Sequence, residues 1–338
     1  MTNPDTSTLN GALEQLGITM AENLVTMGVS DADPSDGLTT LAGKILDIGP
    51  SPTVDSLTLV KSAGKQILSY ADSGATPETE YCTLTATALD SNNQGVSGQS
   101  VVFKVGTTTV ATETTDSNGE ASYTYTSQGS GDVVLSAECS SLIQTYSVQD
   151  CLYYDDASTD KHSNWDTTDS TDTISYDSTN KHYILTKTTS GDSFIKLTDS
   201  IIPSNAKIEF DIRIGGNGSK NAQPRIGLFD TSTSNFVEGR VNITNTYHSI
   251  SWLGRKNNTW TDLPLTNVSS LAINNWYHCE LTFNGSSFSI SIYNGSTLLE
   301  TVTASLSDYL GQTNKLLIDS AYENGSVWNL KNIKVKPL

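Results

Sequence analysis

Apolar and polar residues alternate along most of this chain, which is the pattern of a β-strand with one buried face. Between residues 56 and 150 the alternation comes in short runs, and polar turns such as DSNG separate them. From residue 151 the runs are longer: in residues 208–214, apolar side chains (Ile208, Phe210, Ile212, Ile214) alternate with charged ones (Glu209, Asp211, Arg213). This spacing predicts an all-β protein, with a β-sandwich over residues 51–150 and a jelly roll over residues 151–338.

Residues 1–50 follow a helical period instead. Apolar residues recur there at steps of three and four, at Leu9, Leu13, Leu16, Met20, Leu24 and Met27. Pro34 ends the predicted helix, and residues 37–49 predict a second short one. Because isolated short helices are marginal in water, we expect this segment to be a docking or oligomerisation surface. A helical hairpin packed on the next domain is the alternative.

The 338 residues include 19 Lys and Arg against 37 Asp and Glu, for a net charge of −18. A surface field of this sign repels nucleic acid, and no run of basic residues offers a path for phosphates, so we expect no nucleic-acid partner. No apolar stretch approaches the roughly 18 residues that cross a bilayer. Membrane insertion is therefore not expected.

Four cysteines are scattered along the chain without a CxxC or zinc-ligand spacing. One disulfide among Cys82, Cys139 and Cys151 is left open, because its pairing does not follow from sequence. Cys279 shares the inward alternation of its neighbours, which predicts a buried free thiol.

The segment SWLGRKNNTWTD is the candidate ligand-binding element of the jelly roll. Trp252 and Trp260 flank a hairpin-like turn, and Arg255 and Lys256 lie at its tip. Indole rings stack on sugar faces and cap grooves, so these four residues predict a contact surface. The alternative is that both tryptophans fill the core.

An acidic stretch follows Cys151. Asp155, Asp156 and Asp160 are its candidate metal ligands, because calcium prefers carboxylate oxygens. The spacing is not that of an EF-hand loop, and a solvated acidic loop is the alternative. No other cofactor is expected.

Catalytic constellations are sparse. Glu209 and Asp211 share one face of a predicted strand, as a glycosidase pair would. However, Ile214 occupies the third acidic position of the glucanase ExDxxE pattern, and the four histidines form no hydrolase motif. We therefore interpret the two carboxylates as a solvated strand face and expect no enzymatic activity.

Residues 56–150 resemble the bacterial immunoglobulin-like repeats of invasin and intimin type adhesins. The resemblance rests on a strand ending in Asp90, a Gly-Val-x-Gly step into a VxF strand, the TDSNG turn and a final VVLSA strand. Such modules act as rigid spacers, and that role is what the resemblance implies here.

The segments NNWYHCELTFNGSSFSISIYNG and SVWNLKNIKVKPL resemble the laminin-G and concanavalin-like lectin group. This likeness covers residues 151–338 and implies a two-sheet jelly roll that binds a carbohydrate or protein surface.

The three segments together resemble adhesins and tail fibres of tailed viruses of prokaryotes, and the stretch QDCLYYDDASTDK resembles adhesin-like proteins of methanogenic archaea and their viruses. The opening MTNPDTSTLNGALEQLG lacks the pattern of a secretory signal. We therefore expect a virion-surface protein that binds a host glycan or protein, contacts other virion proteins through residues 1–50 and forms a homo-oligomer, with a trimer favoured by the resemblance. The alternatives are a cellular surface adhesin and a secreted polysaccharide-acting enzyme.

Overall fold

The computed structural model describes residues 52–70, 80–167, 172–188, 194–197, 202–215, 222–231, 234–243, 248–311, 314–322 and 325–338. The helices predicted within residues 1–50 lie outside these ranges. Strands dominate the described chain, which confirms the all-β prediction. In this part of the chain no helix has the length and apolar character needed to span a membrane.

The first sandwich consists of a three-stranded sheet, in the order β1-β3-β6, and a five-stranded sheet, in the order β2-β8-β7-β4-β5. Its strands are β1 (Ser56–Gly64), β2 (Ile67–Ser69), β3 (Tyr81–Leu89), β4 (Ser100–Val105), β5 (Thr108–Thr114), β6 (Glu120–Thr126), β7 (Gly131–Cys139) and β8 (Leu142–Cys151). In β3, Leu84, Ala86 and Ala88 are fully buried between the sheets while the intervening threonines face outward. The predicted alternation thus builds this core.

Contacts with the backbone explain why Asp116 and Gly119 occupy their positions in the TDSNG turn. The Asp116 carboxylate accepts the backbone N–H groups of Asn118 and Glu120. Gly119 has φ +79°, and a Cβ at this position would lie 2.3 Å from the carbonyl oxygen of Ala88. Only glycine suits both the conformation and the close approach.

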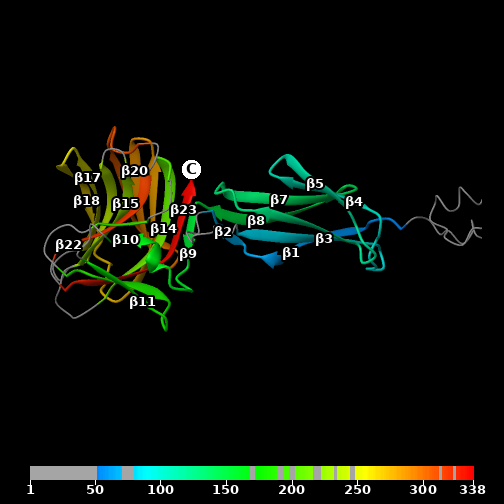
Figure 1. Ribbon diagram of the computed structural model, residues 1–338, viewed down its shortest axis with the longest axis horizontal. Helices are drawn as coiled ribbons and strands as arrows, with labels where there is room; N and C mark the ends of the chain where they lie inside the picture. The colour runs from blue at the N-terminus through cyan, green and yellow to red at the C-terminus, as the bar shows by residue number, and fades with distance from the viewer. Residues whose placement is uncertain are drawn as a thin grey trace, which may run out of the picture.

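The second sandwich packs an eight-stranded sheet, with the path β11-β12-β23-β14-β19-β20-β21 and β9 beside β23, on a seven-stranded sheet, with the order β10-β13-β22-β15-β16-β17-β18. Figure 1 shows the two sandwiches end to end, with the C-terminus of the chain beside their junction. The strands are β9 (Tyr153–Asp155), β10 (Trp165–Asp166), β11 (Thr173–Asp177), β12 (His182–Thr186), β13 (Phe194–Leu197), β14 (Asn205–Gly215), β15 (Ala222–Asp230), β16 (Phe236–Ile243), β17 (His248–Lys256), β18 (Thr259–Asn267), β19 (Trp276–Asn284), β20 (Ser287–Asn294), β21 (Thr297–Ser305), β22 (Asn314–Tyr322) and β23 (Val327–Pro337).

One hydrophobic core fills the space between these two sheets. The even-numbered residues of β14 from Ala206 to Ile214 point into it, and Glu209, Asp211 and Arg213 face outward. Cys279 is fully buried in the same core, as predicted. All four cysteines are buried free thiols, so no disulfide links Cys82, Cys139 and Cys151.

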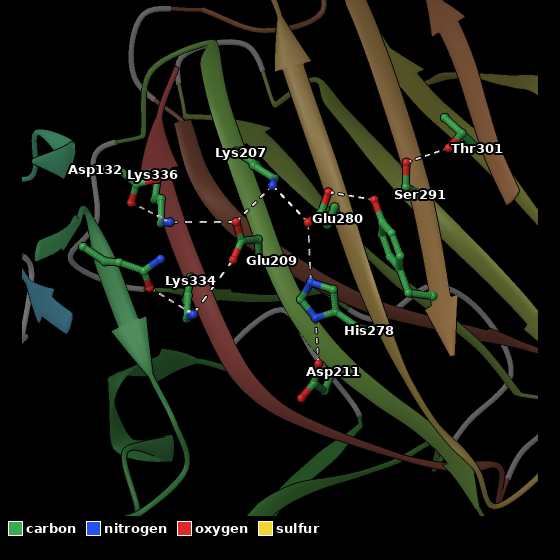
Figure 2. Close-up of polar contacts among 12 residues, drawn as sticks. Asp132, Lys207, Glu209, Asp211, His278, Glu280, Ser291, Thr301, Lys334 and Lys336 are labelled. Carbon is green, nitrogen blue, oxygen red and sulfur yellow. Dashed lines mark hydrogen bonds and ion pairs between the residues drawn. The ribbon is translucent and has the colours of Figure 1, made fainter. Parts of the chain in front are cut away.

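Backbone and side-chain contacts join the two sandwiches. The Leu152 N–H donates to the carbonyl oxygen of Val335 at 2.7 Å, and the Tyr154 N–H donates to the Ser69 hydroxyl at 3.1 Å. At the same junction Lys336 on β23 forms an ion pair with Asp132 on β7 at 2.9 Å (Figure 2). The jelly roll is therefore hydrogen-bonded to the end of the first sandwich rather than only tethered to it.

Candidate ligand-binding surface

The predicted contact residues lie on β17 and β18, at one edge of the seven-stranded sheet. Successive residues of a strand point to opposite faces of its sheet. On β17, Ile250 and Trp252 face the core, whereas Arg255 lies on the outer face, in register with Phe236 on β16 and Trp260 on β18. The strand alternation therefore separates the four predicted residues.

Trp252 is not a surface residue, so its assignment to a contact surface is wrong. Its side chain has no exposed area, and its ring packs against Phe283 and Phe288 with centroids 5.6 and 5.7 Å away. The indole N–H donates to the carbonyl oxygen of Val302 at 3.1 Å, which satisfies its one polar group inside the core. The alternative that this tryptophan fills the core holds for Trp252.

Lys256 also points away from Arg255. Its Nζ lies 3.5 Å from the carbonyl oxygen of Ser307, 3.8 Å from the Asp308 carboxylate and 5.6 Å from the centre of the Tyr309 ring. These contacts tie Lys256 to the loop after β21. They do not bring it together with Trp260.

Trp260 is the exposed aromatic residue of this surface, with 38% of its area accessible. Its ring meets Phe236 edge-on at a centroid distance of 5.3 Å, and Phe236 in turn contacts Phe194 at 5.3 Å. The guanidinium carbons of Arg225 and Arg255 lie 5.8 and 5.5 Å from the centre of the indole ring. We call Phe236, Arg225, Arg255 and Trp260 the outer aromatic patch.

The two arginines of the patch are in different electrostatic states. Arg225 forms a buried ion pair with Asp319 at 2.9 Å and donates to the Gln223 amide oxygen. Arg255 donates to the Asn258 amide oxygen at 2.8 Å but has no carboxylate partner among the described residues. Its Nε is buried and has no hydrogen-bond partner there either. Arg255 thus holds a positive charge that no acid of the described chain neutralises.

Sequence reasoning missed Arg225 and Phe236. Both lie on strands, β15 and β16, that are buried on both faces, so their apolar and polar residues do not alternate in exposure. The sequence carried one usable signal, which concerned Trp252 and Arg255 instead. These two residues are an odd number of positions apart on one strand, so their side chains point to opposite faces of the sheet.

The three acidic residues predicted to bind a metal do not converge. The buried Asp155 carboxylate accepts hydrogen bonds from the hydroxyls of Tyr153 and Tyr183 and from the Ala157 N–H. Asp156 accepts from the Ser158 N–H, and Asp160 contacts His162. Among the described residues, no group of three or more His, Cys, Asp and Glu side chains is arranged to hold a metal ion. Local hydrogen bonds therefore occupy these carboxylates.

Glu209 and Asp211 lie in an ion-pair network on the outer face of the eight-stranded sheet (Figure 2). Lys207 on β14 bridges Glu209 at 3.1 Å and Glu280 on β19 at 3.0 Å. Lys334 and Lys336 on β23 approach Glu209 to 4.0 and 3.9 Å. The carboxylate of Glu209 is thus surrounded by three ammonium groups.

His278 continues this network. Its Nδ1 lies 2.8 Å from Asp211 and its Nε2 3.7 Å from Glu280. The hydrogen bond that His278 donates to the Asp211 carboxylate raises the pKa of His278. Burial alone would raise the pKa of Asp211, but the hydrogen bonds from His278 and Asn332 lower it. Asp211 is therefore held in its ionised form, which does not suit the general acid of a glycosidase.

A comparison with protein families bears on the fold of the first sandwich. Residues 72–149 match the model of the bacterial Ig-like domain (group 1), which supports the resemblance drawn from the TDSNG turn. The comparison with curated proteins gives no match.

Several solved structures resemble about half of this chain at low identity. A carbohydrate binding module, CBM66 from Bacillus subtilis, is 17% identical with a TM-score of 0.39, covering 51% of this chain and 95% of its own. The CBM2 module of the evolved Dit of Lactobacillus casei BL23 phage J-1 is 10% identical with a TM-score of 0.41, covering 55% and 94%. A legume lectin-like domain from Entamoeba histolytica is 11% identical with a TM-score of 0.41, covering 52% and 91%. At these values the likenesses do not bear on ligand or activity.

Proposed function

We propose that this chain is a surface-attachment protein in which the Ig-like sandwich is a spacer and the jelly roll binds a glycan on a host cell. The observation that carries this proposal is the outer aromatic patch. Trp260 is exposed on an edge strand and lies beside Arg255, whose guanidinium has no acidic partner among the described residues.

This arrangement fits sugar recognition on chemical grounds. The faces of sugar rings carry C–H groups that stack on indole, while a guanidinium supplies several hydrogen-bond donors to hydroxyl oxygens. Phe236 and Arg225 contact the Trp260 ring, and these contacts restrict its orientation before a ligand arrives. Preorganisation of this kind lowers the entropic cost of binding.

The junction supports the spacer role. The hydrogen bonds of Leu152 and Tyr154, together with the Lys336–Asp132 ion pair, connect the jelly roll to the end of the first sandwich. A binding domain carried in this way keeps a defined orientation at the tip of its spacer.

The setting that we propose is a tail fibre or adhesin of a virus that infects prokaryotes. Residues 1–50 would dock on the virion or associate the chains into a homo-oligomer. A cellular surface adhesin would use the same patch without virion docking and is the second candidate. A secreted polysaccharide-acting enzyme is the third candidate; its acidic pair would be Glu209 and Asp211, which are engaged in ion pairs and hydrogen bonds.

The test is binding of the labelled full-length chain to a panel of intact prokaryotic cells. We expect saturable binding to a narrow set of cells, reduced at least about tenfold by Trp260→Ala and by Arg255→Gln, which corresponds to about 1.4 kcal/mol. Lys61→Gln, a single charge change on the exposed part of β1, is the matched control for Arg255→Gln. Equal binding by all variants would contradict the proposal.

A further inference from the structure

The middle of the eight-stranded sheet carries an excess of basic residues on its outer face, in a protein with a net charge of −18. Its three central strands, β23, β14 and β19, carry five Lys and Arg residues and three Asp and Glu residues, in addition to His278. The basic residues are Lys207, Arg213, Lys331, Lys334 and Lys336, and the acidic ones are Glu209, Asp211 and Glu280.

The acidic residues of this face are already engaged. Glu209 contacts Lys207, Lys334 and Lys336, and Glu280 contacts Lys207 and His278. Asp211 pairs with Lys331 in the strand register, but its two carboxylate oxygens accept from His278 at 2.8 Å and from Asn332 at 2.6 Å. Figure 2 shows the network running from Asp132 of the Ig-like sandwich across the sheet to Glu280 and His278.

Arg213 and Lys331 form no ion pair within this network, although the charge of Lys331 contributes to the lowered pKa of Asp211. Within the described residues neither side chain has a carboxylate at ion-pair distance. Arg213 donates from Nε to the Asn329 amide oxygen at 3.0 Å, and its two terminal nitrogens have no carboxylate partner among the described residues.

Both cations are directed at one ring. The Nζ of Lys331 lies 4.2 Å from the centre of the Trp276 indole, and the guanidinium carbon of Arg213 lies 5.1 Å from it. Trp276 is only partly buried, and His182 packs edge-on against it at 5.7 Å. Three neighbouring strands therefore fix two positive charges close together, with cation–π contacts offsetting part of their mutual repulsion.

We propose that Arg213, Lys331 and Trp276 form a second ligand site, which binds a carboxylate group of an acidic polysaccharide. A guanidinium beside an ammonium matches one carboxylate, with the arginine able to make two parallel hydrogen bonds to it. The site offers only two cations within a protein of strongly negative charge, so it suits carboxylates separated by sugar rings rather than the dense phosphates of nucleic acid. It lies on the sheet opposite to Trp260 and does not depend on the outer aromatic patch.

The experiment uses the full-length chain and polygalacturonate as the probe, with neutral dextran and dextran sulfate as parallel arms. We expect binding to polygalacturonate at low salt, weakened at least fivefold by Arg213→Gln and by Lys331→Gln. Lys61→Gln changes the same charge elsewhere and should stay within about twofold of the unchanged chain, since an exposed distant charge is screened. Trp260→Ala should also bind polygalacturonate normally, which separates this site from the proposed glycan-binding function.

Several outcomes would overturn the second site. These are binding to polygalacturonate no stronger than to dextran, unchanged binding by both Arg213→Gln and Lys331→Gln, or an equal loss in Lys61→Gln. Tighter binding to dextran sulfate than to polygalacturonate would overturn the proposal that the site prefers a carboxylate. Thermal melts of each variant show whether it is folded, and Trp276→Phe provides an independent readout, because it should abolish any change of tryptophan fluorescence caused by polygalacturonate.

Discussion

Arg255 and Trp260 lie opposite each other on β17 and β18, with the guanidinium carbon 5.5 Å from the centre of the indole ring. Neither residue belongs to the core between the two sheets. A cation–π contact of this kind contributes about 0.5–1 kcal/mol at an exposed site, which is little for the fold. The pair therefore contributes little to stability, and we propose that it contacts a ligand.

Trp252→Ala is expected to lower the free energy of unfolding by about 3–5 kcal/mol, because it removes a fully buried indole and leaves a cavity. Urea unfolding followed by circular dichroism measures this change. A loss of less than about 1 kcal/mol would show that Trp252 is not the core residue described above.

Trp260→Ala is the contrasting substitution. Its ring is partly exposed on an edge strand, so we expect a loss of about 1 kcal/mol or less in the same urea titration. A loss as large as that of Trp252→Ala would mean that the ring has a structural role. A binding defect of Trp260→Ala would then not be evidence that this residue contacts the ligand.

His278 predicts a pH dependence of stability. Its pKa is raised in the folded chain, chiefly by the hydrogen bond that it donates to Asp211, so its contribution to stability is fully present below the unfolded value of about 6.5. The contribution is lost as the pH rises through the folded pKa. Asp211 stays ionised in this range, because its own pKa is lowered.

The measurement for this prediction is the melting temperature of the protein and of His278→Gln at pH 5.5 and pH 8.5. The difference between the two proteins should be larger at pH 5.5. Glu280 and Glu209 also favour the protonated ring, whereas burial opposes it. A difference that is constant or grows toward pH 8.5 would contradict the assignment of His278 to this ion-pair network.

Asp155→Asn separates a hydrogen-bonding role from a metal-binding one. The carboxylate accepts from Tyr153, Tyr183 and the Ala157 N–H, and an amide cannot satisfy all three donors, so we expect a loss of about 1–3 kcal/mol. EDTA should leave the melting temperature of the unchanged protein where it is. A clear fall in melting temperature with EDTA, restored by calcium, would instead support a structural metal.

Much of the fold followed from the sequence because each sheet has one face in a core and, in many strands, one in solvent. On β14, Phe210 and Ile212 turn inward while Glu209 and Asp211 turn outward, as their alternation predicted. The TDSNG turn was recognisable for a local reason, namely that Asp116 caps its own backbone.

The site was predicted only in part. Trp260 and Arg255 are adjacent across two strands, so their short separation in sequence was informative. Arg225 and Phe236 come from strands buried on both faces, where burial does not reveal orientation. Arg213, Trp276 and Lys331 meet only because β23 returns from the end of the chain to lie beside β14, a long-range pairing that no local pattern encodes.

The decisive measurement is saturation binding of the labelled full-length chain to a prokaryotic cell that binds it, before and after periodate oxidation of the surface sugars. We predict saturable binding that falls at least about tenfold after oxidation, and a similar fall for Trp260→Ala on untreated cells. Binding that survives both oxidation and Trp260→Ala would contradict glycan attachment through the outer aromatic patch.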